Sequence, residues 1–255
     1  MKYFAFSDVH GDYDALMQAV KEYGYDPENE NHTLVSCGDN FGRADRGEGS
    51  KGVYTYLTQG KHKNMPVCLK GNHELILQKM LFSRELSTLD IRNGEHRTVY
   101  SFLGRKQAEM DYISYYDLNR LAHSPLMDWL LDLPYCFETD HYIFLHGFLP
   151  QYPNGSYITK NLESADEEAW QTACWAQTPL HILKFPQSYP AGLQAKDGTP
   201  KWVVFGHWMN RELRRVLERA QDVDDSLWKN ERLHLCGLDT CTYASHRVEM
   251  LVVED

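Results

Sequence analysis

The sequence predicts an α/β fold that carries a helical insertion. Two observations lead to this prediction. Short apolar runs typical of strands alternate with helical patterns over the first half of the chain, and residues 82–133 show helical patterns without strands. The chain has 255 residues, of which 42% are hydrophobic and 13% aromatic, which is typical of a globular protein rather than a disordered one. We therefore expect a single domain over residues 1–255, with the insertion at about 82–133.

Seven short apolar runs, rich in aromatic and β-branched residues, are expected to form strands. They span residues 3–6, 33–37, 67–70, 142–145, 202–205, 233–238 and 248–253. A set of this size would also fit a single mixed sheet.

Helical periodicity lies between and beyond these runs, over residues 13–23, 50–57, 74–81, 107–121 and 125–133. The first of these segments places Leu16, Ala19 and Val20 on one face. Aromatic residues at helical spacing in the later block are expected to pack a core, with stacking over a site as the alternative. These residues are Tyr112, Tyr115 and Tyr116. Residues 150–200 contain several prolines and are expected to be mostly loop and short helix.

Five of the apolar runs end directly in Asp, His or Asn beside a glycine. The residues concerned are Asp8, His10, Asp39, Asn72, His146 and His207. Open α/β sheets build their sites at the carboxyl ends of strands, and glycine lets the backbone turn sharply there. Any one of these residues alone could be an ordinary turn or loop residue, so the prediction rests on their coincidence. Oxygen and nitrogen donors of this kind suit Mn, Fe, Zn or Ni. Their number exceeds the ligands that one ion needs, so two divalent ions are expected if one carboxylate bridges them.

Charge and cysteine usage exclude several classes of protein. The chain has 26 Lys and Arg against 36 Asp and Glu, and its net charge of −10 disfavours a nucleic-acid polymer as partner but still allows a small phosphate at a metal site. No apolar run is long enough to span a membrane, and the N-terminal run is too short for a signal peptide.

The six cysteines form no C-x-x-C pair and mostly lie in apolar runs. Reduced cysteines and a cytoplasmic location are expected, rather than a disulfide framework or a zinc knuckle.

Six motifs resemble those of the calcineurin-like metallophosphoesterases. They are Asp8-Val9-His10-Gly11, Gly38-Asp39, Asp45-Arg46-Gly47, Gly71-Asn72-His73-Glu74, His146-Gly147 and Gly206-His207. More narrowly, the set is similar to the phosphoprotein phosphatase branch, which contains bacterial Ser/Thr phosphatases and diadenosine tetraphosphatases. The resemblance covers nearly the whole chain. It implies two packed mixed β-sheets flanked by helices, the αββα sandwich of that family.

The resemblance also implies a role for each site residue. One metal ion would be held by Asp8, His10 and Asp39, and the other by Asp39, Asn72, His146 and His207, with Asp39 bridging. His73 would protonate the leaving oxygen, with Asp45 behind it, and Arg46 and Asn72 would bind the phosphoryl group. A hydroxide that bridges the two ions would attack phosphorus in line, so no covalent phosphoenzyme is expected.

The chain departs from the family pattern at three places. The usual spacing would put Asp-Arg-Gly where this chain has Gly42-Arg43-Ala44, and Asp45 and Arg46 come three residues later. We expect Asp45 and Arg46 to take the family roles through a three-residue insertion, with Arg43 as the alternative or additional phosphate ligand. Gln177 stands where similar bacterial phosphatases carry arginine, and Asp239-Thr240-Cys241 only partly follows the family's Asp-Thr-Gly.

The predicted function is phosphoester hydrolysis by a dinuclear metal centre, as a phosphomonoesterase of the Ser/Thr protein phosphatase type acting on phosphorylated protein. The alternative is a dinucleoside polyphosphate hydrolase with a nucleotide substrate such as diadenosine tetraphosphate. That alternative follows from the similarity of Gly206-His207-Trp208 and Leu238-Asp239-Thr240 to symmetrical diadenosine tetraphosphatases. A non-catalytic metal-binding module is a third possibility, which the complete set of donors disfavours.

Overall fold

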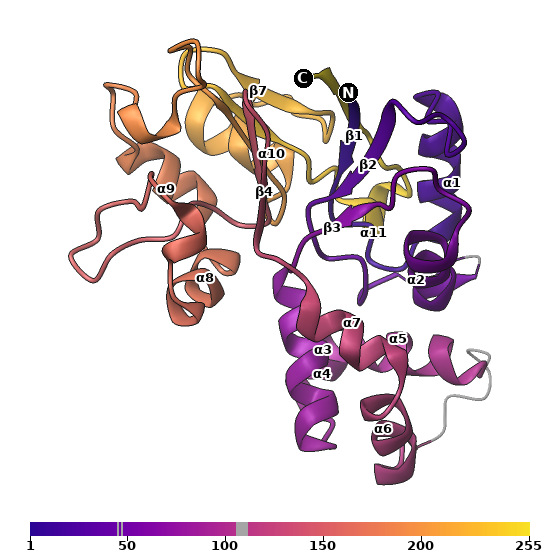
Figure 1. Ribbon diagram of the computed structural model, residues 1–255. Coiled ribbons are helices and arrows are strands. Elements are labelled where there is room, and N and C mark those ends of the chain that lie inside the picture. The colour runs from indigo at the N-terminus through magenta and orange to yellow at the C-terminus, as the bar shows by residue number, and fades with distance from the viewer. Residues whose placement is uncertain (45, 47, 106–111) are drawn as a thin grey trace.

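The computed structural model describes residues 1–44, 46, 48–105 and 112–255, and it contains two β-sheets between layers of helices (Figure 1). The first sheet has the strand order β3-β2-β1-β9. Strands β1 (Lys2–Phe6), β2 (His32–Ser36) and β3 (Val67–Cys68) run parallel, and β9 (Leu251–Glu254) pairs antiparallel with β1. The chain therefore begins and ends in the same mixed sheet.

The second sheet has the strand order β4-β5-β6-β8-β7. Its three central strands, β5 (Tyr142–Leu145), β6 (Trp202–Phe205) and β8 (Leu235–Gly237), run parallel. Both edge strands, β4 (Cys136–Glu138) and β7 (Trp228–Asn230), pair antiparallel with their neighbours. These two edge strands are not among the strands that the sequence predicts.

The two sheets pack face to face through one shared apolar layer. Ala5 and Val35 of the first sheet lie in a cluster with Phe144, Val204 and Cys236 of the second, and all five side chains are fully buried. Such a layer between inner faces is what holds a β-sandwich together. The sandwich implied by the family resemblance is thus confirmed, and a single mixed sheet is excluded.

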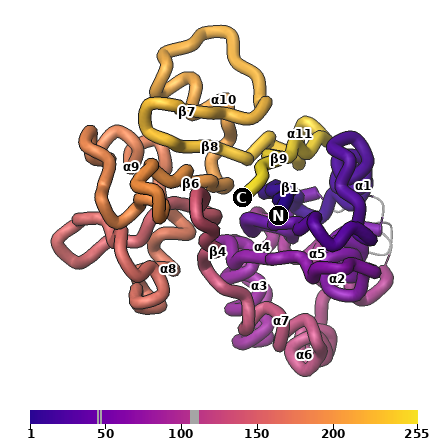
Figure 2. Tube along the Cα trace, turned by 45° about the horizontal axis from the view of Figure 1, so that its top comes forward, coloured from indigo at the N-terminus to yellow at the C-terminus, as the bar shows by residue number. Residues whose placement is uncertain are grey.

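Helices α1 (Tyr13–Glu22) and α2 (Gly49–Gln59) cover the outer face of the first sheet, opposite α8 and α9 in the turned view (Figure 2). Asp12 caps the N-terminus of α1, where its Oδ1 accepts a hydrogen bond from Ala15 N at 3.1 Å. Its buried face presents Leu16, Ala19 and Val20 to the core, as its periodicity predicts.

Within the described part of the segment after β3, five helices form a group at one end of the first sheet (Figure 1). They are α3 (Asn72–Ser83), α4 (Thr88–Asn93), α5 (Glu95–Leu103), α6 (Tyr115–Ala122) and α7 (Pro125–Asp132). Tyr112, Tyr115 and Tyr116 are exposed by 83%, 57% and 81%, so the expectation that they pack in a core is wrong. In α6 the buried face belongs to Leu118 and Leu121, which turns the tyrosines outward.

The outer face of the second sheet is covered by α8 (Glu167–Cys174), α9 (Thr178–Lys184) and loops, with 3₁₀ turns at Leu162–Ser164 and Ala191–Leu193. Helix α10 (Asn210–Leu213), a π turn (Arg214–Glu218) and helix α11 (Thr242–Ser245) complete the chain. Residues 150–200 are therefore short helix and loop, as predicted. Within the described ranges, no helix combines the length and the apolar character that crossing a membrane requires.

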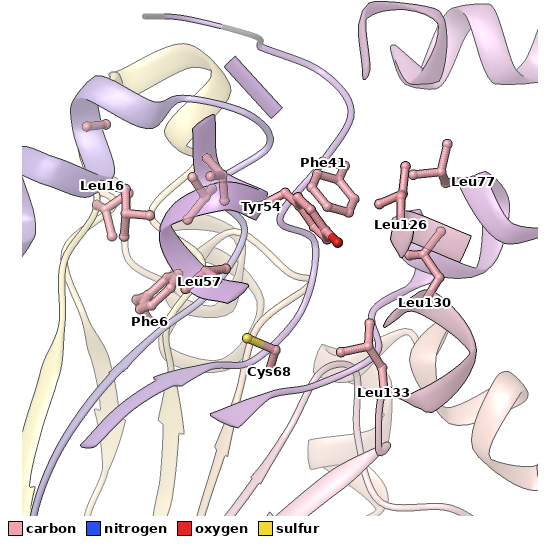
Figure 3. Close-up of a cluster of buried hydrophobic side chains, with 14 of the residues drawn as sticks. Phe6, Leu16, Phe41, Tyr54, Leu57, Cys68, Leu77, Leu126, Leu130 and Leu133 are labelled. Atoms are coloured by element: carbon pink, nitrogen blue, oxygen red, sulfur yellow. The ribbon is translucent and has the colours of Figure 1, made fainter. Parts of the chain in front are cut away.

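Helix α7 anchors the helical group to the core of the first sheet (Figure 3). Leu130 is fully buried in the same apolar cluster as Phe41 and Tyr54, whereas its neighbour Leu131 is 46% exposed. We expect Leu130→Ala to lower the free energy of unfolding by about 2–5 kcal/mol, because it leaves a cavity. Leu131→Ala, on the same helix, should change it by less than about 0.5 kcal/mol. Denaturant unfolding of both variants tests this, and equal losses would contradict it.

Candidate metal centre and active site

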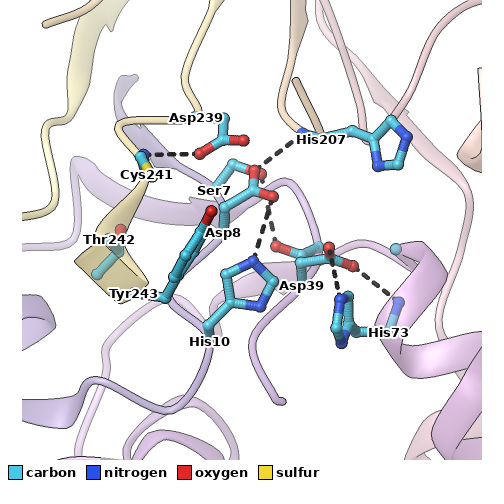
Figure 4. Close-up of polar contacts among 12 residues, drawn as sticks. Ser7, Asp8, His10, Asp39, His73, His207, Asp239, Cys241, Thr242 and Tyr243 are labelled. Atoms are coloured by element: carbon cyan, nitrogen blue, oxygen red, sulfur yellow. Dashed lines mark hydrogen bonds and ion pairs between the residues drawn. The ribbon is translucent and has the colours of Figure 1, made fainter. Parts of the chain in front are cut away.

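Six polar residues that follow the ends of five strands lie close together, and Figure 4 shows four of them, Asp8, His10, Asp39 and His207. They follow β1 (Asp8, His10), β2 (Asp39), β3 (Asn72), β5 (His146) and β6 (His207). All are buried except His207, which is half-buried. The structure therefore brings together every residue that the sequence proposes as a metal ligand, and it draws them from both sheets.

Four of these residues have left-handed backbone, which is uncommon for residues other than glycine. The φ angles are 55° at Asp8, 52° at His10, 54° at Asp39 and 69° at His207. Backbone hydrogen bonds hold the turns in place, from Asp8 N to Gly38 O at 3.1 Å and from His10 N to Asp39 O at 3.0 Å. Backbone strain of this kind gathers at functional sites, where the surrounding structure enforces it.

The donor atoms form two groups that share Asp39. His10, Asp39 and His73 make one group, and Asp39, His146 and His207 make the other, with all donor atoms of a group within 4.8 Å of one another. Asp39 Oδ1 lies 3.3 Å from His146 Nε2, and Asp39 Oδ2 lies 3.9 Å from His73 Nε2. Each group contains the oxygen and nitrogen donors that a transition-metal ion prefers.

Two of the histidines are oriented by backbone carbonyl groups. His10 Nδ1 lies 3.0 Å from the oxygen of Phe41, and His146 Nδ1 lies 2.8 Å from the oxygen of Cys37. A carbonyl oxygen only accepts, so each Nδ1 carries a proton, and Nε2 is the ring nitrogen that can bind a metal ion. Metal-binding histidines are commonly held in this way. Both imidazoles therefore fit a metal ion.

Burial and mutual proximity shift the pKa values of the donors. Burial raises the pKa of Asp8 to about 6, and it lowers the pKa values of His10 and His207 to about 3. Against the effect of burial, Asp39 raises the pKa of His146 to about 10, and His146 holds the pKa of Asp39 well below its usual range. An ionised carboxylate beside neutral imidazoles is the state that binds a cation, and a cation would replace the proton on His146.

Residues 1–211, which contain all six converging donors, match the sequence profile of the calcineurin-like phosphoesterases. The chain belongs to this family. Membership confirms the resemblance seen in the motifs, and it indicates a metal-dependent hydrolase.

Two solved structures show the same fold as this phosphoesterase. One, provisionally assigned as a diadenosine tetraphosphatase, has a TM-score of 0.51 and 17% identity, and the match covers 99% of this chain and 92% of that one. The other is the cold-active protein-tyrosine phosphatase of a psychrophilic Shewanella sp. It has a TM-score of 0.55 and 16% identity, and the match covers 100% of this chain and 75% of that one. No curated protein matches the sequence significantly.

Glu74 fixes the turn that carries Asp39 in this phosphoesterase. Its Oε2 accepts hydrogen bonds from Asp39 N at 2.8 Å and Gly71 N at 2.9 Å, and its Oε1 accepts one from Asn40 N at 2.8 Å. The sequence assigns Glu74 no role, although a glutamate in the third position of a helix is a known signal for capping backbone N–H groups.

His73 has a buried carboxylate partner that the sequence does not predict. Its Nδ1 lies 2.5 Å from Oε1 of Glu95, the first residue of α5, and both side chains are buried. Burial lowers the pKa of His73, but Asp39 and Glu95 outweigh burial and raise it to about 9. Burial raises the pKa of Glu95 to about 7, against the opposing charge of His73. Asp45, the partner expected from the sequence, lies outside the described residues.

The two arginines expected to bind phosphate lie in different surroundings. The guanidinium carbon of Arg43 lies 5.0 Å from the ring centre of Tyr243, and that ring lies 6.0 Å from the ring of His10. The positive charge of Arg43 adds to burial in lowering the pKa of His10. Arg46 is exposed, as Arg43 is, and its backbone N donates to Gly11 O at 2.9 Å. The charge of Arg43 thus acts on a proposed metal ligand, and its guanidinium group lies against Tyr243 at the edge of the site.

The segment after β8 closes the site beside Asp8 (Figure 4). Asp239 is buried and accepts a hydrogen bond from Cys241 N at 2.8 Å, and burial, reinforced by Asp8, raises its pKa well above the usual range. On the other side of the site, the ring of Trp175 lies 6.4 Å from that of His207. Sequence reasoning gives Asp239 and Trp175 no site role. A signal for Asp239 is present, because it directly follows the predicted strand at residues 233–238, whereas Trp175 follows no predicted strand.

Proposed function

We propose that the protein is a phosphomonoesterase of the Ser/Thr protein phosphatase type that uses two divalent metal ions, Mn, Fe, Zn or Ni. The sharing of Asp39 between two groups of imidazoles carries this proposal, since a common carboxylate is how a protein holds a pair of ions. One ion would be bound by Asp8, His10 and Asp39, and the other by Asp39, Asn72, His146 and His207. The substrate would be a phosphorylated protein.

When bound, the two ions would activate a water molecule and neutralise charge on the phosphoryl group. The side chains around them would bind the phosphoryl group and supply a proton. Arg46, which the sequence favours, would bind the phosphoryl oxygens together with Arg43, whose charge contributes to lowering the pKa of His10. Asn72, whose Oδ1 lies 2.9 Å from His146 Nε2, would help to position the phosphoryl group. His73 would deliver a proton from Nε2 to the leaving oxygen.

A dinucleoside polyphosphate hydrolase is the second candidate, and the exposed ring of Trp175 favours it. This side chain is 48% exposed and stands beside His207, where it could stack a nucleotide base. The solved structure provisionally assigned as a diadenosine tetraphosphatase also has nearly all of its length covered by this chain.

Turnover of a phosphoserine peptide and of diadenosine tetraphosphate, measured side by side, tests the proposed function. The protein is first stripped with a chelator and then reloaded with manganese. We expect stripping to abolish turnover and manganese to restore it, with kcat/KM for the phosphopeptide exceeding that for the dinucleotide. The reverse preference would support the second candidate. Turnover of neither substrate, with metal demonstrably bound, would overturn both in favour of a non-catalytic metal-binding module.

A further inference from the structure

We propose that Glu95 is the positioning residue for His73, and that the absence of a side chain at Gly42 makes room for this pair. The inference rests on the proposed function, which gives His73 its role as proton donor. The carboxylate that orients the donor would thus come from α5, in the helical group.

The contact between the two side chains is short and isolated. Glu95 Oε1 lies 2.5 Å from His73 Nδ1, and the same ring directs Nε2 toward Asp39 Oδ2 at 3.9 Å. The other oxygen of Glu95 is buried and has no hydrogen-bond partner among the residues that the structure describes. A carboxylate bound to Nδ1 fixes the tautomer and the orientation of an imidazole, so that Nε2 faces the reacting atoms.

Gly42 makes room for the ring of His73. Its φ is +99°, and a Cβ atom at this position would lie 2.4 Å from His73 Nδ1 and 2.9 Å from His73 Cε1. Real Cβ atoms do not approach that closely, so a side chain at residue 42 would displace the ring. The glycine therefore leaves room for the His73 ring in the position where Glu95 contacts Nδ1.

Helix α5 also holds the loop that carries Arg43. Gly42 N donates to Thr98 Oγ1 at 3.0 Å, and Arg97 Nη1 donates to the backbone oxygen of Arg43 at 2.8 Å. One helix therefore fixes both the partner of His73 and the backbone of the proposed phosphate ligand.

A purely structural role for Glu95 predicts something different. As the first residue of α5, its negative charge also stabilises the N-terminus of that helix. Loss of that effect would lower stability, but it would not make the remaining activity depend on the leaving group.

The test compares Glu95→Gln with wild type and with the exposed control Glu85→Gln, each loaded with manganese. For the phosphoserine peptide, we expect kcat to fall about 10- to 100-fold with KM unchanged, since the donor remains but is poorly oriented. For an activated aryl phosphate, whose leaving oxygen needs no proton, kcat should change less than about threefold. Metal content should stay at the wild-type value, and the control should match wild type throughout. Equal loss on both substrates, or no loss on either, would overturn the proposal.

A second variant disturbs the contact between His73 and Glu95 by crowding the ring of His73. Gly42→Ala should give the same dependence on the leaving group, because its Cβ would push the ring of His73 away from Glu95. Gly24→Ala is the matched control, since its φ of +72° imposes similar backbone strain with no atom within 4 Å of the new Cβ. If Gly42→Ala keeps wild-type kcat on the phosphopeptide, the proposed crowding is wrong.

Proton NMR of the metal-free protein separates failure of this inference from failure of the proposed function. We expect a strongly downfield Nδ1–H resonance that is absent in His73→Asn and is lost or moved upfield in Glu95→Gln. Were wild type to hydrolyse neither substrate, the proposed function would fail, and the resonance would still decide the pairing. A resonance unchanged in Glu95→Gln would overturn the pairing whatever the activity.

Discussion

An Asp39→Asn variant should lose both metal ions, and its turnover should fall by at least about three decades, because the ions supply several kcal/mol of transition-state stabilisation. Asp39 belongs to both groups of donors, with Oδ1 next to His146 and Oδ2 next to His73. An amide lacks the negative charge that offsets two cations. Its oxygen can still accept the hydrogen bond that His73 N donates to Oδ1 at 2.9 Å, so the fold should persist.

Elemental analysis of purified Asp39→Asn, together with kcat on the phosphoserine peptide, measures this effect. Asp222→Asn, at an exposed position away from the site, is the control and should retain wild-type metal content and turnover. If Asp39→Asn keeps two metal ions per chain, Asp39 does not bridge them.

His73→Asn should leave the metal content intact and reduce turnover of the phosphoserine peptide by about two to four decades, the usual range for loss of a general acid. The alkoxide that leaves from serine is a poor leaving group and needs the proton, whereas an activated aryl phosphate does not. Turnover of the aryl ester should therefore be largely retained, and the ratio of the two rates is the quantity to measure.

The metal content of His73→Asn carries as much information as its rate. His73 Nε2 lies within the same group as donor atoms of His10 and Asp39, so it could itself bind an ion. Loss of one ion per chain in the variant would show that His73 is a ligand, and an equal loss of turnover on both substrates would point the same way. His123→Asn, on the exposed end of α6, is the matched control.

Sequence patterns give the positions of the six converging donors because the pattern is local. Each of the runs before Asp8, Asp39 and His207 forms a parallel strand, and parallel strands place their carboxyl ends along one edge. The packing of the two sheets is not local, and it follows here from the resemblance to a known family.

Other features depend on contacts between distant segments, which no window of sequence contains. Strands β4 and β7 have three residues each, paired along one edge only, so their own residues carry a weak signal. Glu95 lies in a helix far from any strand end, and only the folded chain brings it to His73. The left-handed backbone at His10 is equally unpredictable, because it is imposed by hydrogen bonds to the neighbouring Asp39 loop.

The proposed ligands come from both sheets of the sandwich, and this has a thermodynamic consequence. Asp8 and Asp39 follow strands of the first sheet, and His146 and His207 follow strands of the second. A pair of cations bound by all four would act as a cross-link, so neither sheet could unfold without releasing the metal ions. Resistance to denaturation would then rise with the free cation concentration, by about 2.7 kcal/mol at one hundred times the dissociation constant. The free metal-ion concentration would thereby set the stability of the folded chain as well as its turnover.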